Sequence, residues 1–154
     1  VESHSAFFEK SAADLDAVLR PKTIGSAALD RALAAQPLDF VCYFSSSSAM
    51  LGDFGACDYA IANRYQMAYA EHRRGSGAAG RTLAINWPLW AQGGMGAADP
   101  AQTAAYLKRT GLEALRSEDG LAIWRALLGE ERGQTLVMAG QPGKVGALLD
   151  RLYG

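Results

Sequence analysis

Two short apolar runs constrain the fold of this chain more than any other feature. Residues 40–44 read Phe-Val-Cys-Tyr-Phe, and residues 82–87 read Thr-Leu-Ala-Ile-Asn-Trp. Runs of this length, rich in aromatic and β-branched residues, are typical of strands buried on both faces of a parallel sheet. We expect a helix between them, over residues 56–74. The sequence therefore predicts an α/β fold in which helices alternate with parallel strands.

The other expected elements fit this alternation. Ser11 stands where a helix N-cap is expected, and the apolar residues that follow it recur with helical spacing as far as the break near Pro21. A third strand is expected over residues 135–139. Further helices are expected over residues 27–33, 101–109, 120–128 and 144–153. No internal repeat interrupts this pattern.

A hydroxyl, a phenol and an amide are expected to meet at the end of the first strand. Ser45 and Ser46 follow that strand directly, and Tyr59 comes thirteen residues after Ser46. Asn63 is four residues beyond Tyr59, so a helix would place both on one face. In open α/β sheets the ligand crevice lies outside the carboxyl ends of the strands. Taken alone, Ser46 is better explained by a turn, and Tyr59 has an alternative explanation as a half-buried aromatic on an amphipathic helix.

Composition excludes several classes of function. The 154 residues carry 15 basic and 16 acidic side chains, a net charge of −1, which argues against a nucleic acid or an anionic membrane as partner. Cys42 and Cys57 have neither CxxC spacing nor histidines at zinc-ligand intervals, so we expect free thiols and no metal site. No apolar run is long enough to span a membrane, and a cytoplasmic protein is expected.

Five ordered motifs closely resemble the ketoreductase domain of modular polyketide synthases, in the short-chain dehydrogenase/reductase superfamily. They are Arg20-Pro21-Lys22-Thr23-Ile24-Gly25, Pro37-Leu38-Asp39-Phe40, Phe44-Ser45-Ser46, Asp58-Tyr59 through Asn63, and residues 85–95, Ile-Asn-Trp-Pro-Leu-Trp-Ala-Gln-Gly-Gly-Met. The sequences of the second and fifth motifs resemble those of synthase modules that are served by a separate acyltransferase. The resemblance implies a Rossmann-like, doubly wound parallel sheet.

One departure from that family concerns the cofactor. Its members bind the dinucleotide with a glycine-rich turn between the first strand and the first helix, and no such turn opens this sequence. Residues 93–96 are rich in glycine but lack the G-x-G-x-x-G spacing, so we expect an ordinary loop there. The resemblance therefore aligns residues 1–154 with the C-terminal half of the catalytic subdomain. The isolated piece is expected to be inactive and to expose a sheet edge.

The resemblance also implies roles for individual residues. The reaction is reduction of a β-ketoacyl thioester on an acyl carrier protein by NADPH, with the N-terminal half of the ketoreductase as a further partner. Ser46 would hold the ketone oxygen, Tyr59 would donate the proton, Lys22 would favour the phenolate, and Asn63 would orient the lysine and a relay water. The implied cofactor contacts are Ser45, Trp87, Pro88 and Leu89. The implied substrate contacts are Leu51 and Met95, with a substrate lid over residues 93–117.

The stereochemical fingerprints of the family are incomplete. One product configuration goes with Leu-Asp-Asp at the positions held here by Glu2, Ser3 and His4, and the other with a tryptophan at the position of Leu51. The missing aspartates favour the L-hydroxyl product. Two alternatives to the reductase stay open: a noncatalytic remnant that serves as a spacer or docking element, and a dehydrogenase acting on a free small molecule. The latter usually carries lysine, not asparagine, at the position of Asn63.

Overall fold

The computed structural model describes residues 7–52, 56–92 and 100–154, and the chain folds as two compact units. The first unit comprises the residues up to Asn86 together with Gly133–Leu136. The second unit comprises Trp87–Arg132 and Val137–Gly154. The residues expected to be catalytic all belong to the first unit, which is where the sheet is built.

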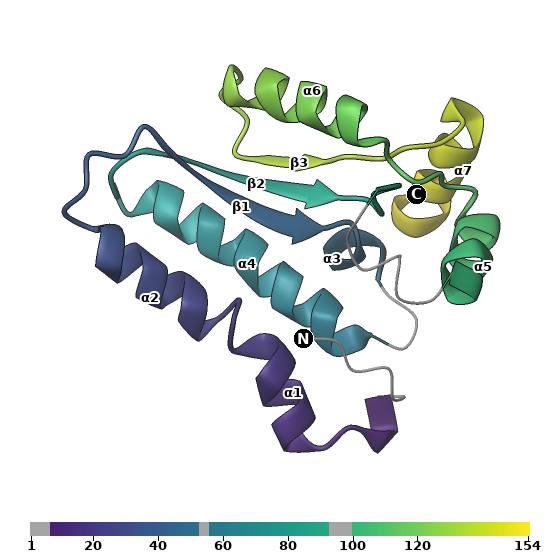
Figure 1. Cartoon of the computed structure of the whole chain (residues 1–154), viewed down its shortest axis with the longest axis horizontal. Helices are drawn as coiled ribbons and strands as arrows, with labels where there is room; N and C mark the ends of the chain where they lie inside the picture. Colours follow the sequence, from purple (N-terminus) through teal and green to yellow (C-terminus); the bar gives the residue numbers. More distant parts are fainter. Residues whose placement is uncertain (1–6, 53–55, 93–99) are drawn as a thin grey trace. The chain divides into compact units, whose positions relative to one another are not determined.

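The sheet has three strands in the order β1-β2-β3: β1 is Phe40–Ser46, β2 is Arg81–Trp87 and β3 is Gln134–Leu136. β2 and β3 are parallel, with Ile85 opposite Thr135. β1 runs in the same direction as β2 (Figure 1). The predicted α/β fold with a parallel sheet is confirmed, although the third strand stops at Leu136 instead of reaching residue 139.

β2 is the buried centre of the sheet, and β1 is not. Residues 82–87 are all buried, with Ile85 completely so. On β1 the burial alternates instead: Tyr43 is 5% exposed, whereas Phe40 and Phe44 on the opposite face are 40% and 50% exposed. The prediction that β1 is buried on both faces is therefore wrong for this chain. The reason is that Tyr43 packs against Ala70 of a neighbouring helix, while the opposite face of β1 remains accessible.

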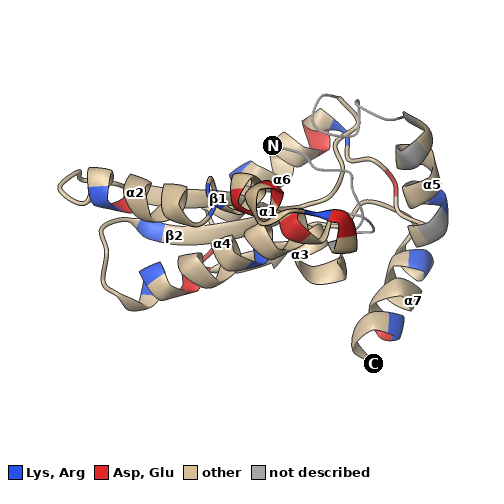
Figure 2. Ribbon diagram, turned by 90° about the horizontal axis from the view of Figure 1, so that it is seen from below, with Lys and Arg blue, Asp and Glu red and all other residues tan. Residues whose placement is uncertain are grey.

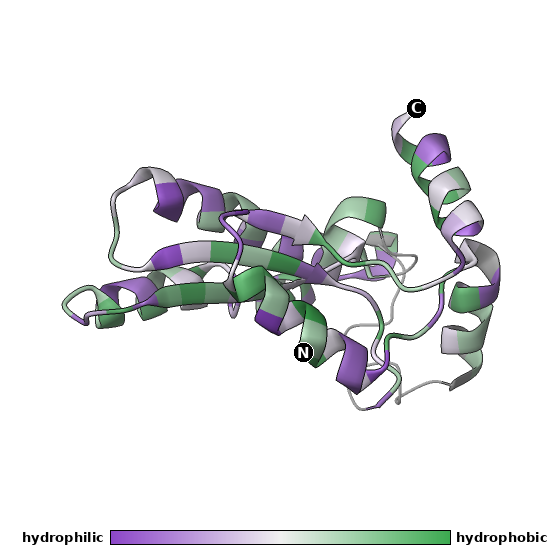
Figure 3. Cartoon of the chain, turned by 90° about the horizontal axis from the view of Figure 1, so that it is seen from above, coloured by the Kyte–Doolittle hydropathy of each residue, from purple (hydrophilic) through white to green (hydrophobic). Residues whose placement is uncertain are grey.

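The described residues of the first unit also form five helical segments. They are η1 (Phe7–Glu9), α1 (Ala12–Leu19), α2 (Ile24–Leu33), α3 (Ser48–Leu51) and α4 (Cys57–Gly75). The long helix α4 packs against β1, α1 and α3. Figure 1 shows it lying along the strands, with α1 and α2 beside it. Charged residues lie mainly on the helices (Figure 2), and the middle of β1 and of β2 is hydrophobic (Figure 3).

Local sequence explains where these helices begin and end. Ser11 caps α1 as predicted, because its Oγ accepts a hydrogen bond from the Asp14 backbone N–H while the Asp14 carboxylate accepts one from the Ser11 N–H. Helix α3 was not predicted, and it begins at Ser48, the last serine of the run that ends β1. Gly52 ends α3 with a φ of 75°, a left-handed conformation that glycine adopts without strain.

A buried arginine joins α4 to α2 and to the start of β2. The Arg73 Nε donates to Asp30 Oδ1 over 2.6 Å, and the guanidinium also donates to Thr82 Oγ1 and to the carbonyls of Ala79 and Gly80. Asp30 also accepts from the Tyr69 hydroxyl over 3.1 Å. Every acceptor in this Arg73 cluster is thereby paired with a donor, as a buried charge requires.

The described part of the second unit contains three helices and two isolated bridges. The helices are α5 (Pro100–Thr110), α6 (Ser117–Leu128) and α7 (Pro142–Tyr153), at or within a few residues of the predicted positions. Bridges join Trp90 to Leu115 and Leu112 to Gly140. Gly120 lies against the Trp90 ring, where a Cβ would collide. None of the helices that the structure describes is both long and apolar enough to cross a membrane.

Candidate active site

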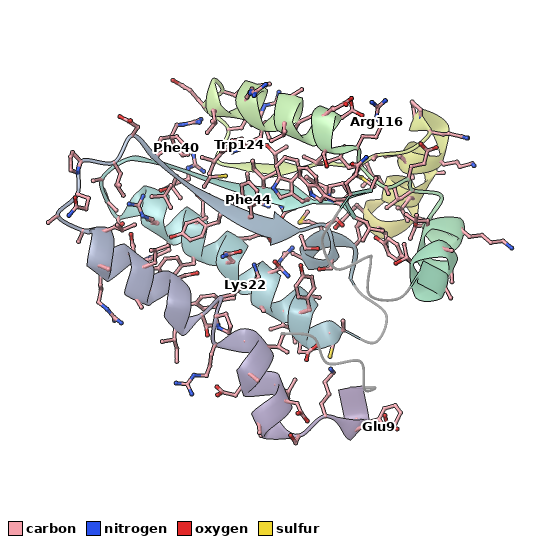
Figure 4. The ribbon with its side chains drawn as sticks, viewed as in Figure 1. Glu9, Lys22, Phe40, Phe44, Arg116 and Trp124 are labelled. Carbon is pink, nitrogen blue, oxygen red and sulfur yellow. The ribbon has the colours of Figure 1, made fainter. Side chains whose placement is uncertain are left out.

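Lys22 lies in the turn between α1 and α2 and connects β1 to α4. Its Nζ donates to the backbone oxygen of Phe44 over 3.1 Å and to Gln66 Oε1 over 2.8 Å (Figure 4). Burial lowers the pKa of Lys22 because the charged ammonium loses part of its hydration. The Lys22 ammonium is thus held at the backbone of Phe44, which lies two residues before Ser46 on β1.

Ser46 ends β1 with its hydroxyl in an arrangement suited to donation. Ser46 Oγ accepts from the backbone N–H of Ser48 over 3.2 Å and from the Ser48 hydroxyl over 3.0 Å. A serine hydroxyl has two acceptor lone pairs and one proton, so these two bonds use the lone pairs. The Ser46 proton remains for a hydrogen bond to a further acceptor, such as a ketone oxygen.

Tyr59 and Asn63 occupy the first two turns of α4, on the face predicted from their spacing. Asn63 is completely buried, and its Nδ2 donates to the Tyr59 backbone oxygen over 2.8 Å. The Asn63 Oδ1 is buried without a hydrogen-bond partner among the residues that the structure describes. An acceptor of this kind can accept a hydrogen bond from a bound molecule. Ser45 Oγ donates to the Asn63 backbone oxygen over 3.3 Å and joins β1 to α4.

A buried ion pair fixes the start of α4 beside Tyr59. Lys10 Nζ lies 3.0 Å from Asp58 Oδ2, and both side chains are at most 1% exposed. The other oxygen of Asp58 accepts the backbone N–H of Tyr59 over 3.0 Å. This pair was not predicted from the sequence, because nothing in the spacing of Lys10 and Asp58 brings them together. Its effect is to hold the first turn of α4 against the segment that precedes α1.

Gln66, like Lys10, was not predicted from the sequence to belong to the site. It contacts Lys22 directly, and it follows Tyr59 by seven residues and Asn63 by three. Residues at this spacing share one face of a helix, so the helix predicted over residues 56–74 already contained the signal that would have found it. The first unit therefore carries a cation bonded to β1 and to Gln66 of α4, and a strand-end hydroxyl bonded to Ser48. The Asn63 amide lies on the same face of α4 as Gln66 and bonds to the Tyr59 backbone.

The remaining predicted contacts stay predictions. Trp87 is 5% exposed, its ring centroid lies 5.1 Å from that of Trp90, and Pro88 is also buried. Both belong with Leu89 to the second unit. Leu51 is the half-buried last residue of α3.

Several predictions fall wholly or partly outside the described residues. Met95, the first part of the predicted lid and the stereochemical positions Glu2, Ser3 and His4 are among them. The described part of the lid region contains α5. Neither Cys42 nor Cys57 is in a disulfide, and the described part of the chain has no group of three potential metal ligands.

The fold places the chain in a class, and comparison with known proteins gives the family. A parallel sheet flanked by helices, with a serine at a strand end and a tyrosine on the next long helix, defines the Rossmann-like class of the short-chain dehydrogenases/reductases. The family model for the KR domain matches residues 1–92. The chain belongs to the ketoreductase (KR) domain family, as the sequence motifs predicted.

Polyketide synthases contain sequences closely similar to this chain. It is 48% identical over 149 residues to the polyketide synthase PksM of Bacillus subtilis, covering 97% of this chain and 4% of that protein. It is 38% identical over 157 residues to the polyketide synthase ThaG of Burkholderia thailandensis, covering 99% of this chain and 3% of that protein. The chain thus spans only a small part of these relatives.

Solved structures give the same fold. A ketoreductase domain from the bacillaene assembly line superposes with a TM-score of 0.87 at 33% identity, covering 98% of this chain and 36% of that one. An N-terminal ketoreductase from the macrolactin assembly line gives a TM-score of 0.84 at 34% identity, with 97% and 28% covered. The predicted Rossmann-like fold is confirmed, and the chain corresponds to about a third of these structures.

Proposed function

We propose that this chain carries the catalytic residues of an NADPH-dependent reductase that converts a β-ketoacyl thioester on an acyl carrier protein to the β-hydroxyacyl thioester. The observation that carries the proposal is the network at the end of β1, where Lys22 is bonded to Phe44 O and to Gln66 on the helix of Tyr59. Membership of the KR domain family supports it. The partners would be the carrier protein, the N-terminal half of the ketoreductase and other synthase domains, in the cytoplasm.

Each catalytic residue of this chain would have a separate role in the reduction of the ketone. Bound NADPH would supply the hydride that adds to the β-carbon, which leaves negative charge on the oxygen. The free proton of Ser46 would bond to that oxygen, and the Tyr59 hydroxyl would transfer its proton to it. The Lys22 ammonium would stabilise the phenolate that remains. Asn63, whose Oδ1 has no partner in the described part of the chain, would hold the water that returns a proton to the phenol.

The residues present fit the nicotinamide end of such a cofactor but not its phosphates. Ser46 has a proton to donate, and Asn63 has an acceptor that is unpaired among the residues that the structure describes. No glycine-rich turn follows a first strand in this sequence. We therefore assign the phosphate site to the N-terminal half of the ketoreductase, and the contacts beside the nicotinamide to Ser45, Trp87, Pro88 and Leu89. The sequences of the second and fifth motifs support a synthase that is served by a separate acyltransferase.

The decisive experiment compares Tyr59→Phe with Tyr65→Phe in the complete synthase polypeptide, by following NADPH oxidation with a β-ketoacyl carrier-protein thioester. Tyr59→Phe removes the proton donor, so we expect kcat to fall by about 100-fold or more. Tyr65, on the same helix, is partly exposed and stacks on Tyr69, so its variant should retain activity. An inactive but folded, NADPH-binding parent would refute the proposal in favour of a noncatalytic remnant. Chiral analysis of the product would test the expected L-configuration.

A further inference from the structure

Lys22 is held by two acceptors that carry no charge. One is the Phe44 backbone oxygen at 3.1 Å and the other is Gln66 Oε1 at 2.8 Å. Because a lysine ammonium only donates hydrogen bonds, the amide oxygen of Gln66 must be the atom that faces it. An ammonium has three N–H groups, and the third has no acceptor among the residues that the structure describes.

The choice of an amide at this position has an electrostatic consequence. The usual partner of a partly buried lysine is a carboxylate, which would cancel its positive charge. Gln66 has the same shape as glutamate and accepts the same hydrogen bond, yet it leaves the charge of Lys22 intact. A reductase whose lysine must favour a phenolate needs that charge undiminished at the phenol.

We propose that Gln66 is a positioning residue for Lys22, whose neutral amide fixes the ammonium beside the face of α4 that carries Tyr59 and Asn63 without cancelling its charge. This inference rests on the proposed function, because it assigns Lys22 its role in proton transfer. The helix supports it geometrically, since Tyr59, Asn63 and Gln66 follow one another on one face of α4. Gln66 itself touches neither substrate nor cofactor in this proposal.

Other charged groups near this end of α4 are already paired, bonded or exposed. Lys10 and Asp58 form the buried ion pair, Asp16 and Arg20 form an exposed one, and Arg64 donates to the Ala49 backbone oxygen. Glu9 is exposed, and Asp14 belongs to the cap of α1. β1 and α3 contribute no charged side chain. Gln66 is therefore the position where one added charge would act most directly on Lys22.

Two substitutions separate positioning from simple structural support. Gln66→Glu keeps the acceptor and adds a negative charge, so the pKa of Lys22 should rise by about one unit. Gln66→Met removes the acceptor at similar volume, so the pKa of Lys22 should fall further. Gln36→Glu adds the same charge at an exposed position beyond α2 and should change nothing. The pKa of Lys22 is measured by NMR of labelled lysine side chains in the complete polypeptide, and folding is checked by thermal unfolding.

Turnover gives the second measurement. In Gln66→Glu the phenol loses the lysine charge, so it ionises at higher pH and the alkaline limb of the kcat profile should move up by about one pH unit. In Gln66→Met the ammonium is less well fixed, and we expect kcat to fall by about tenfold while NADPH affinity stays unchanged.

Each outcome bears on one of the two proposals. Folded variants with an unchanged pKa of Lys22, or with an unchanged pH profile, would overturn the role of Gln66. An inactive parent would instead refute the proposed function, and with it any role of Gln66 in reduction. Opposite shifts in the pKa of Lys22 would in that case still demonstrate the contact, so the two failures remain distinguishable.

Discussion

At the scale of single residues, Ser46 and Ser48 illustrate how a neighbouring residue can leave the proton of a hydroxyl available for donation. Ser48 donates twice to Ser46 Oγ, and this leaves the Ser46 proton available. We expect Ser46→Ala to lower kcat/KM of the complete ketoreductase by about 100-fold, because one donor to the developing oxyanion is lost. Ser48→Ala keeps the backbone donor and should cost less than about tenfold. Equal losses in the two variants, measured as NADPH oxidation, would contradict this division of roles.

Some residues of the site were predictable and others were not, for identifiable reasons. Tyr59 and Asn63 follow from helical spacing once a helix is expected, and Ser46 follows from the end of a strand. The position of Lys22 came from its resemblance to a family motif, because a turn between two helices gives no periodic signal. Lys10 lies far before its partner Asp58 in the sequence, and no local pattern records such a contact.

At the scale of elements, the Arg73 cluster holds α4 against α2 and β2. Replacing Arg73 by Met removes the donor to Asp30 Oδ1 and to the carbonyls of Ala79 and Gly80, while the Tyr69 hydroxyl still donates to Asp30 Oδ2. We expect the free energy of unfolding to fall by about 3 kcal/mol, which is the lower end of the cost of breaking a buried ion pair. The measurement is urea unfolding followed by circular dichroism.

Arg20→Met is the matched control for this change. Arg20 pairs with Asp16 over 3.4 Å, but the two side chains are 62% and 60% exposed. Exposed pairs contribute little, so the expected loss is within about 0.5 kcal/mol. If the two arginine variants had the same midpoint in urea, the Arg73 cluster would not be what joins these elements.

The strands show where element prediction reaches its limit. β2 is flanked by neighbours on both sides, and residues 82–87, which are largely apolar, are all buried. β1 has an equally apolar run, yet one of its faces is accessible. An apolar sequence indicates that a strand is buried in the complete fold. It does not indicate whether the residues that cover the strand lie in the same part of the chain. Helix α3 is too short to produce any periodicity.

At the scale of the whole molecule, β1 combines two features that favour association. It is an outer strand of the sheet in the part of the chain that is described, and its exposed face carries Phe40 and Phe44. The bacillaene ketoreductase domain extends well beyond the region that corresponds to this chain, which covers 36% of it. A strand edge with apolar side chains is a site for pairing with another chain.

We therefore expect the isolated 154 residues to self-associate through β1. The net charge of −1 offers little electrostatic repulsion to prevent it. Size-exclusion chromatography should show elution that moves to larger size with rising concentration, and Phe44→Lys should shift it back toward the monomer, because a lysine on an edge strand opposes pairing. Phe8→Lys removes an aromatic that is 86% exposed but lies on η1, so it should have no such effect. A parent chain that elutes as a monomer at every concentration would show that the β1 surface does not drive association.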